Sequence, residues 1–298
     1  MAEGTIDQRR LALRRPMRLR SDRLAGSIVR YAFLGFWAAL CLVPMILVIS
    51  TALKDPLIDT GNPFELFSSV RPQNLVDAWT LGNFGRYFLN TIVIMVPVVL
   101  GVVALSTMAG YAFARFEFPA RGALFFVFIL GLMIPFFSVM IPLFYNLRDY
   151  GLLDTPMAVI LPSIAGAGGT GLPLGIFLMR AFFLDVPDEL ADAARVDGCD
   201  EFGVFRRIMV PLAIPGASAL AVLAFMSAWN TFLLPLIYLS GEENRTLATG
   251  LLLFTGGRTQ ELELTAAATL IMIAPVVVFF LLFQKQFIQG LTSGAVKG

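Results

Sequence analysis

The residues of this chain that are best placed to do chemistry lie in one acidic stretch, residues 180–211. Its segment 185–198 reads DVPDELADAARVDG. Acidic residues fall where the positive end of a helix dipole favours them, and a glycine falls where a left-handed residue ends a helix. We therefore predict a short helix over residues 187–198, with Asp185 as its N-cap and Gly198 as its stop.

A second helix is predicted directly after the first, from about Asp200 or Glu201 to Met209. Pro211 then begins the next apolar stretch. The two helices form a compact helix–turn–helix between two apolar stretches.

The first helix carries the pattern of a docking surface. Helical spacing brings Leu190, Ala193, Ala194 and Asp197 near one another. Alanine lets another backbone approach closely, and the acidic residues around it offer partners to a basic groove, so docking into another protein is one interpretation. A solvated amphipathic loop helix explains the same composition, and residue types alone do not decide between the two.

Catalytic and metal-binding groups are scarce. The chain has no histidine, which removes histidine general bases, Ser-His triads and histidine-ligated zinc. Its two cysteines, Cys41 and Cys199, are too few for a disulfide framework, and we expect free thiols. Lysine occurs only at Lys54, Lys285 and Lys297, never after a glycine-rich phosphate loop. We expect no ATP hydrolysis, no metal site and no cofactor on this chain.

The composition is that of a membrane protein. Hydrophobic residues make up 57% of the 298, charged residues only 14%, and the mean hydropathy is +0.79. These values exclude a soluble enzyme and a disordered chain. A net charge of +1 does not indicate nucleic acid as a partner. Crossing the hydrocarbon core takes about 20 apolar residues. Six uncharged stretches are long enough: residues 31–53, 90–114, 122–145, 155–179, 212–239 and 264–284.

We therefore predict an all-α integral membrane protein with six transmembrane helices. A basic tail (1–30), a transmembrane domain (31–284) and a second tail (285–298) make up the chain, and the longest loop, 54–89, is too short to fold alone. The first stretch is longer than the apolar part of a cleaved signal peptide, so we expect an uncleaved anchor.

Lysine and arginine are distributed unevenly between the two sides of the membrane. With the N-terminus inside, inner segments hold 16 of them and outer segments hold 6, so we predict both termini in the cytoplasm. The basic tail serves mainly this orientation and also suits contact with anionic membrane lipids.

The six stretches contain no Asp, Glu, Lys or Arg, which lowers the case for an ion-coupled carrier without removing sodium sites built from carbonyl groups. A membrane-embedded enzyme is disfavoured further, because no histidine activates the serines in these stretches. Prolines in every stretch and a glycine-rich run at 166–175 fit broken helices around a moving pathway. Ordinary kinks and close helix packing explain any single one of them equally well.

Residues 189–199, ELADAARVDGC, resemble the EAA loop of permease subunits in binding-protein-dependent ABC importers. Asp192 stands where that motif usually has Glu, which keeps the charge. Three further segments are similar to the MalG-like carbohydrate branch of that family: AGYAFAR at 109–115 with Phe118-Pro119, Trp229-Asn230-x-Phe232 with Pro235-Leu236, and the ending 290–298.

The resemblance implies a permease in the bacterial plasma membrane that forms half of a translocation pathway. Its implied partners are a second homologous permease, two ATPase subunits that hold ATP and Mg, and an extracellular or periplasmic sugar-binding protein. The implied ATPase-coupling residues are Glu189, Leu190, Ala191, Asp192, Ala193, Ala194, Asp197 and Gly198.

Two further sets of residues are candidates for contact with solute or binding protein. Asn230 beside Trp229 offers an amide and an aromatic face for a sugar, although an interhelical hydrogen bond explains the amide as well. The last outer loop offers Gly256, Gly257, Arg258 and Thr259 to the binding protein, and a flexible turn is the plainer explanation. The remaining alternatives are an ion-coupled carrier and an ABC permease for a solute other than sugar.

Overall fold

The computed structural model describes residues 18–293, apart from residues 56, 59–61, 63 and 256–261; the side chains of 18–26 and 285–293 are also outside the description. Within this part of the chain the regular structure is entirely helical. The apolar composition favours helices, because a helix satisfies its own backbone hydrogen bonds inside a membrane.

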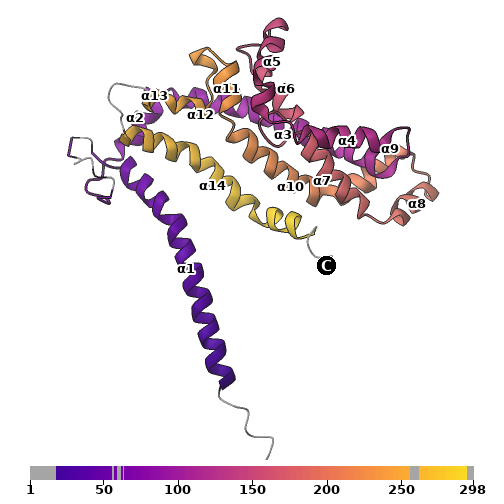
Figure 1. Cartoon of the computed structure of the whole chain (residues 1–298), viewed down its shortest axis with the longest axis horizontal. Coiled ribbons are helices and arrows are strands. Elements are labelled where there is room, and N and C mark those ends of the chain that lie inside the picture. The colour runs from indigo at the N-terminus through magenta and orange to yellow at the C-terminus, as the bar shows by residue number, and fades with distance from the viewer. Residues whose placement is uncertain (1–17, 56, 59–61, 63, 256–261, 294–298) are drawn as a thin grey trace, which may run out of the picture.

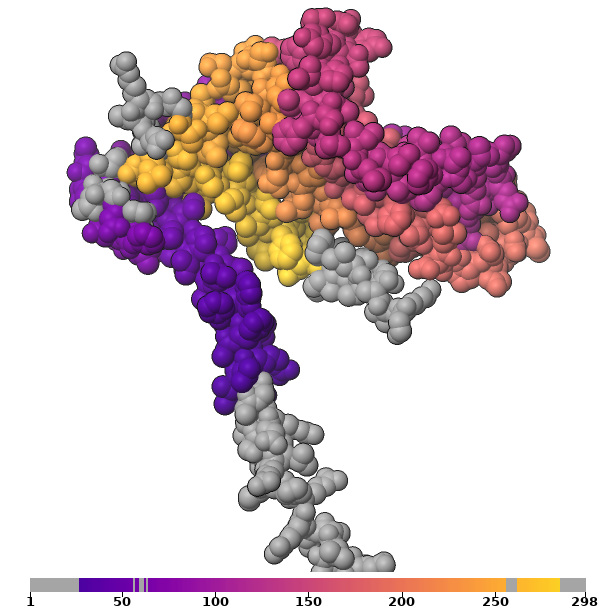
Figure 2. All heavy atoms as spheres, in the orientation of Figure 1, coloured from indigo at the N-terminus to yellow at the C-terminus, as the bar shows by residue number. Residues whose placement is uncertain are grey.

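Four helices of the described chain are long and apolar enough to cross a membrane. They include α1 (Arg18–Ala52), α3 (Phe84–Arg115) and α14 (Leu262–Ser293). The fourth runs without a break from Glu201 to Trp229 and contains α9 (Glu201–Val204), the π-helix η1 (Phe205–Met209) and α10 (Val210–Trp229). α3, α10 and α14 form the body, whereas α1 extends away from it and exposes nearly its whole apolar surface (Figures 1 and 2).

The remaining apolar stretches are broken, which sequence analysis did not predict for any particular residue. The stretch 122–145 forms α4 (Arg121–Gly131) and α5 (Phe136–Asp149), bent by 96°. The stretch 155–179 forms α6 (Met157–Ala165) and the start of α7 (Leu172–Leu184). Counting the bent pair as one, the described residues hold up to five spans, so the predicted six stays a prediction.

Backbone geometry explains these breaks. Pro135 lacks an amide proton and is extended, with φ −70° and ψ 136°, so the helix does not continue through it and α5 begins directly after it. Gly166 and Gly168 have φ of 109° and 79°, in the left-handed region that favours glycine. The third break follows Asn230, after which the chain continues as α11 (Leu233–Tyr238).

Short helices lie at one end of the long helices and the acidic helix α8 (Asp188–Val196) lies at the other (Figure 1). The short ones are α2 (Gln73–Leu81), the 3-10 turn η2 (Glu242–Asn244), α12 (Leu247–Gly250) and α13 (Leu252–Thr255). Buried Asn74 fastens α2 to the end of α1 by donating to the carbonyl oxygens of Ala52 (3.0 Å) and Lys54 (2.7 Å).

The break between α6 and α7 packs against the break between α10 and α11. The backbone amide of Thr170 donates to Oγ of Ser227 (2.9 Å). A Cβ added at Gly168 would lie 2.5 Å from Leu234, and one added at Gly169 would lie 1.9 Å from Oγ of Ser227. The turn therefore needs glycine for its close approach to α10 and α11.

Gly169→Ala is expected to lower the free energy of unfolding by about 1–3 kcal/mol, the usual cost of overpacking. The double variant Gly169→Ala with Ser227→Ala should be about as stable as Ser227→Ala alone. Without Oγ, the nearest atom to the new Cβ becomes Cβ of Ser227, at 3.3 Å. Thermal unfolding of the four purified proteins measures this coupling. Additive losses in the double variant would contradict the contact.

Candidate functional site

The predicted acidic helix is present as α8, but its start differs from the prediction. Pro187 is extended, with φ −59° and ψ 139°, and the helix begins directly after it, with Asp188 and Glu189 in the first turn. Asp185 is not its N-cap: it has helical angles and ends α7 as the C-cap. Two residues then separate Asp185 from α8, too many for a capping contact of the predicted kind.

The predicted stop is confirmed. Gly198 has φ +88° and follows the last helical turn. The amide of Gly198 donates to the carbonyl of Arg195 (3.0 Å), and the amide of Cys199 donates to that of Ala194 (3.0 Å). This pair of bonds is the Schellman arrangement, which satisfies carbonyl groups that a helix end leaves unpaired.

α8 has a buried face and an exposed face, and the eight predicted coupling residues divide between them. Ala191 and Ala194 are 4% and 6% exposed and pack toward α9 and η1. The other six are exposed: Glu189, Leu190, Asp192, Ala193, Asp197 and Gly198. Val196, which the motif did not single out, is 87% exposed on the same helix.

An ion pair joins α8 to the helix that follows it, and a cap fixes the start of that second helix. Arg195 pairs with Asp192 (2.7 Å) and with Glu201 of α9 (2.7 Å). The Asp200 side chain accepts from the amide of Gly203 (2.8 Å) and so caps α9. The predicted second helix thus starts where expected, but it does not end at Met209, because η1 continues directly into α10.

The exposed face of α8 suits binding to a protein and not catalysis. It combines three carboxylates, and a fourth at its C-cap Asp197, with small and aliphatic side chains, and Arg195, the basic residue in its last turn, is already paired. Among the described residues no group of three or more His, Cys, Asp or Glu could hold a metal ion. Cys41 and Cys199 are both free, as expected.

The structure separates the two predicted solute contacts. The Trp229 side chain is 2% exposed, packs on Phe88 and Phe225, and donates its indole N–H to the carbonyl of Met272 (3.2 Å). It presents no free ring face in this conformation. Asn230, at the end of α10, is exposed and donates to the carbonyl of Met226 (2.8 Å).

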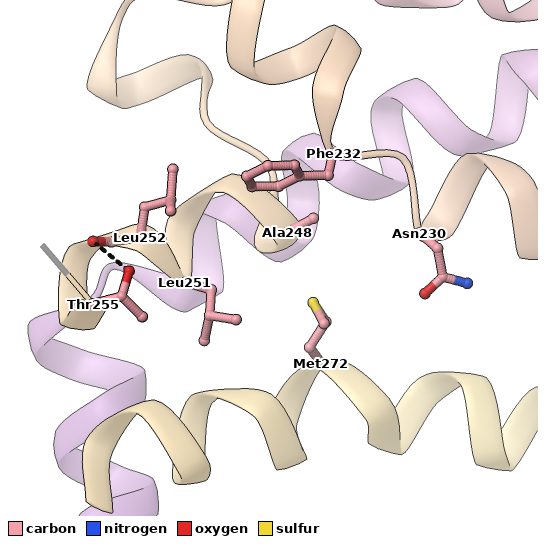
Figure 3. A pocket seen from close by; sticks show the side chains of 7 residues that line it. All are labelled: Asn230, Phe232, Ala248, Leu251, Leu252, Thr255 and Met272. Carbon is pink, nitrogen blue, oxygen red and sulfur yellow. Dashed lines mark hydrogen bonds between the residues drawn. The ribbon is translucent and has the colours of Figure 1, made fainter. Parts of the chain in front are cut away.

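Asn230 lines a cavity of about 310 Å³ between α10, α12, α13 and α14 (Figure 3). The other lining residues are Phe232, Ala248, Leu251, Leu252, Thr255 and Met272. Its polar groups are few, and an aromatic ring lies among aliphatic ones, a composition typical of small-molecule sites.

Loop contacts at the end opposite α8 involve residues that sequence analysis missed. Asn90 of α3 donates to the carbonyl groups of Glu243 (2.7 Å) and Arg245 (2.9 Å). The amide of Gly241 donates to Asp154 (2.9 Å), which together with Asn244 lowers the pKa of that carboxyl. These bonds fix the beginning of the last loop. The residues predicted to touch a binding protein, 256–259, lie outside the described residues.

The long apolar helices, the broken helices and the exposed acidic helix together define a multi-pass helical membrane protein with an acidic helix at one end. Residues 103–293 match the family described as binding-protein-dependent transport system inner membrane component, and the chain belongs to this family. It is accordingly a transport component and not an enzyme. Family membership implies that the chain functions together with a partner permease, an ATPase and a binding protein.

Three relatives cover most of the chain. The diacetylchitobiose uptake system permease protein NgcG of Streptomyces coelicolor is 32% identical over 93% of this chain and 91% of its own length. The arabinooligosaccharides transport system permease protein AraQ of Halalkalibacterium halodurans is 36% identical, with coverages of 91% and 95%. The melibiose/raffinose/stachyose import permease protein MelC of Bacillus subtilis is 31% identical, with coverages of 86% and 91%.

A solved structure has the same fold. It is a chain in the crystal structure of a bacterial ABC transporter involved in the import of the acidic polysaccharide alginate. The TM-score is 0.76 at 24% identity, and the match covers 90% of this chain and 98% of that chain.

Proposed function

We propose that the chain is the permease subunit of an ATP-driven sugar importer and that α8 is the helix through which it couples to an ATPase. The observation that carries this proposal is the exposed acidic face of α8, joined to α9 by an ion pair at one end of the membrane helices, in a chain of this family. The oligosaccharide solutes in the names of NgcG, AraQ and MelC support sugar as the solute class.

In this mechanism the work is divided between chains. Two ATPase subunits hold ATP and Mg, and each permease of a homologous pair inserts its α8 into a groove of one of them. This chain contributes the shape of the pathway and the mechanical link, because its exposed carboxylates meet a basic groove and its buried alanines hold α8 against α9. Both termini and α8 lie on the cytoplasmic side, and the last outer loop, with Gly256 to Thr259, meets the binding protein.

Reconstitution in vesicles tests the proposal. The chain is co-purified from its host with its associated proteins and tested for uptake of labelled oligosaccharides. We expect uptake to require both ATP and a binding protein and to persist when ion gradients are collapsed. Uptake driven by an ion gradient without ATP would overturn the proposal. Uptake of other solutes only would support the permease assignment but overturn sugar as the solute class. One relative is named for the uptake of osmoprotective compounds.

Asn230 is the proposed solute contact on this chain. Asn230→Ala removes an amide at the wall of the cavity, and the loss of one neutral hydrogen bond corresponds to about a 2- to 10-fold rise in the solute concentration for half-maximal uptake. The thermal midpoint should change little, because the Asn230 amide bonds to Met226 in the preceding turn of its own helix and not, among the described residues, to another helix. Unchanged uptake with a lowered midpoint would assign Asn230 to structure alone.

A further inference from the structure

Arg115, the last residue of α3, joins three elements at the end of the molecule where α8 lies. Its guanidinium donates to the carbonyl of Phe183 in the last turn of α7 (2.7 Å) and to the carbonyl of Val186 in the loop after it. It also forms an ion pair with Asp188, the first residue of α8. The Arg115 side chain is only 11% exposed, whereas that of Asp188 is 82% exposed.

The contact needs an arginine. The two Nη atoms reach a carboxylate and two carbonyl groups at the negative end of α7, which a forked guanidinium does and a lysine ammonium does not. The buried Nε meets no acceptor in the described part of the chain, so attachment depends on the two Nη groups alone.

Aromatic side chains next to Arg115 pack α3 directly against α7. One turn earlier, the Tyr111 ring of α3 lies against Phe183 of α7 and Phe205 of η1, with ring centroids 5.3 and 4.9 Å apart. A displacement of α8 that reaches Arg115 therefore reaches a long membrane helix directly. The second attachment of α8, from Arg195 to Glu201, leads instead to α9 and α10.

We infer that Arg115 is a positioning residue that transmits the movement of α8 to α3. This inference rests on the proposed function, because it assumes that α8 is driven by an ATPase subunit. Arg115 does not itself touch the ATPase or the solute. Its role is to set the angle and stiffness of α8 relative to α3 and α7.

The test compares solute transported per ATP hydrolysed in the reconstituted complex. In Arg115→Gln the ratio should fall about fivefold or more, because a charge-assisted and forked contact is lost. Binding of the ATPase subunit should persist, read out as crosslinking from Val196→Cys on the exposed face. Arg115→Lys should not restore the ratio, since it keeps the charge but not the fork.

Arg121 provides a matched control. It lies at the same end of α3 and also donates to backbone carbonyl groups, those of Phe113 (2.9 Å) and Ala114 (3.2 Å), but in the described part of the chain it makes no bond to α8. Arg121→Gln should leave the transport ratio unchanged. If Arg115→Gln does not accumulate in the membrane, Asp188→Asn serves instead, because that side chain is 82% exposed and its change leaves no buried group unpaired, and the ratio should fall about twofold.

Two results distinguish a failure of the inference about Arg115 from a failure of the proposed function. A wild-type transport ratio in assembled Arg115→Gln, or in Asp188→Asn when Arg115→Gln does not accumulate, overturns the inference and leaves the proposed function intact. Absence of any crosslink from Val196→Cys in the otherwise wild-type complex overturns the proposed function itself.

Discussion

Ala193→Arg is expected to abolish binding-protein-dependent uptake while the chain stays folded in the membrane. Ala193 is exposed on α8, next to carboxylates, and is small enough for a partner backbone to approach. Arginine adds bulk and a positive charge at this position, and in a buried protein contact such a change weakens binding by about 30-fold or more. The helix itself tolerates it, because arginine is nearly as good a helix former as alanine.

The measurement is the amount of ATPase subunit that co-purifies with the permease, together with uptake in vesicles. Ala193→Ser, which stays small and uncharged, is the matched control and should retain most of both. Gly198→Glu tests the same surface at the turn that follows α8. Glutamate at the left-handed φ of +88° adds strain of about 1–2 kcal/mol. Gly198→Asn should be much milder, because asparagine adopts this conformation more readily. Normal uptake by Ala193→Arg would mean that α8 is a solvated loop helix.

The acidic helix was predictable from sequence because its signals are local. The glycine stop, the acids of the first turn and the start of α9 at Glu201 all depend on residues within one or two turns. The apolar stretches were predictable for the same reason, since length and absence of charge suffice. The N-cap at Asp185 was wrong because α7 extends to Leu184 and uses Asp185 to end its own last turn.

Other features depend on contacts between distant segments, and no local signal reveals them. Nothing near Arg115 indicates that it reaches Asp188, 73 residues further along the chain. Trp229 and Asn230 are neighbours in sequence, yet the end of α10 between them leaves one buried and the other exposed. Proline and glycine mark many positions in the apolar stretches, but only tertiary packing decides that the breaks fall at Pro135 and Gly166.

Packing between α3 and α7 gives the second large prediction. Gly110 lies where the two helices touch: an added Cβ would be 2.6 Å from Cβ of Met179, 2.8 Å from the amide nitrogen of Arg180 and 3.0 Å from the Met179 carbonyl carbon. Two of these atoms are backbone and cannot turn aside. Gly110→Ala must therefore separate the helices, at a cost of about 1–3 kcal/mol or more.

The separation should also impair coupling, because Arg115 reaches the end of α7 from only five residues further along α3. We expect Gly110→Ala to lower the thermal midpoint by several degrees and to reduce solute transported per ATP. Gly122→Ala, where an added Cβ meets nothing within 4 Å, is the matched control and should be silent. Met179→Ala should not rescue Gly110→Ala, since it keeps both Cβ and backbone, in contrast to the rescue of Gly169→Ala by Ser227→Ala. A Gly110→Ala protein with wild-type stability and transport ratio would show that α3 and α7 are not packed this closely in the membrane.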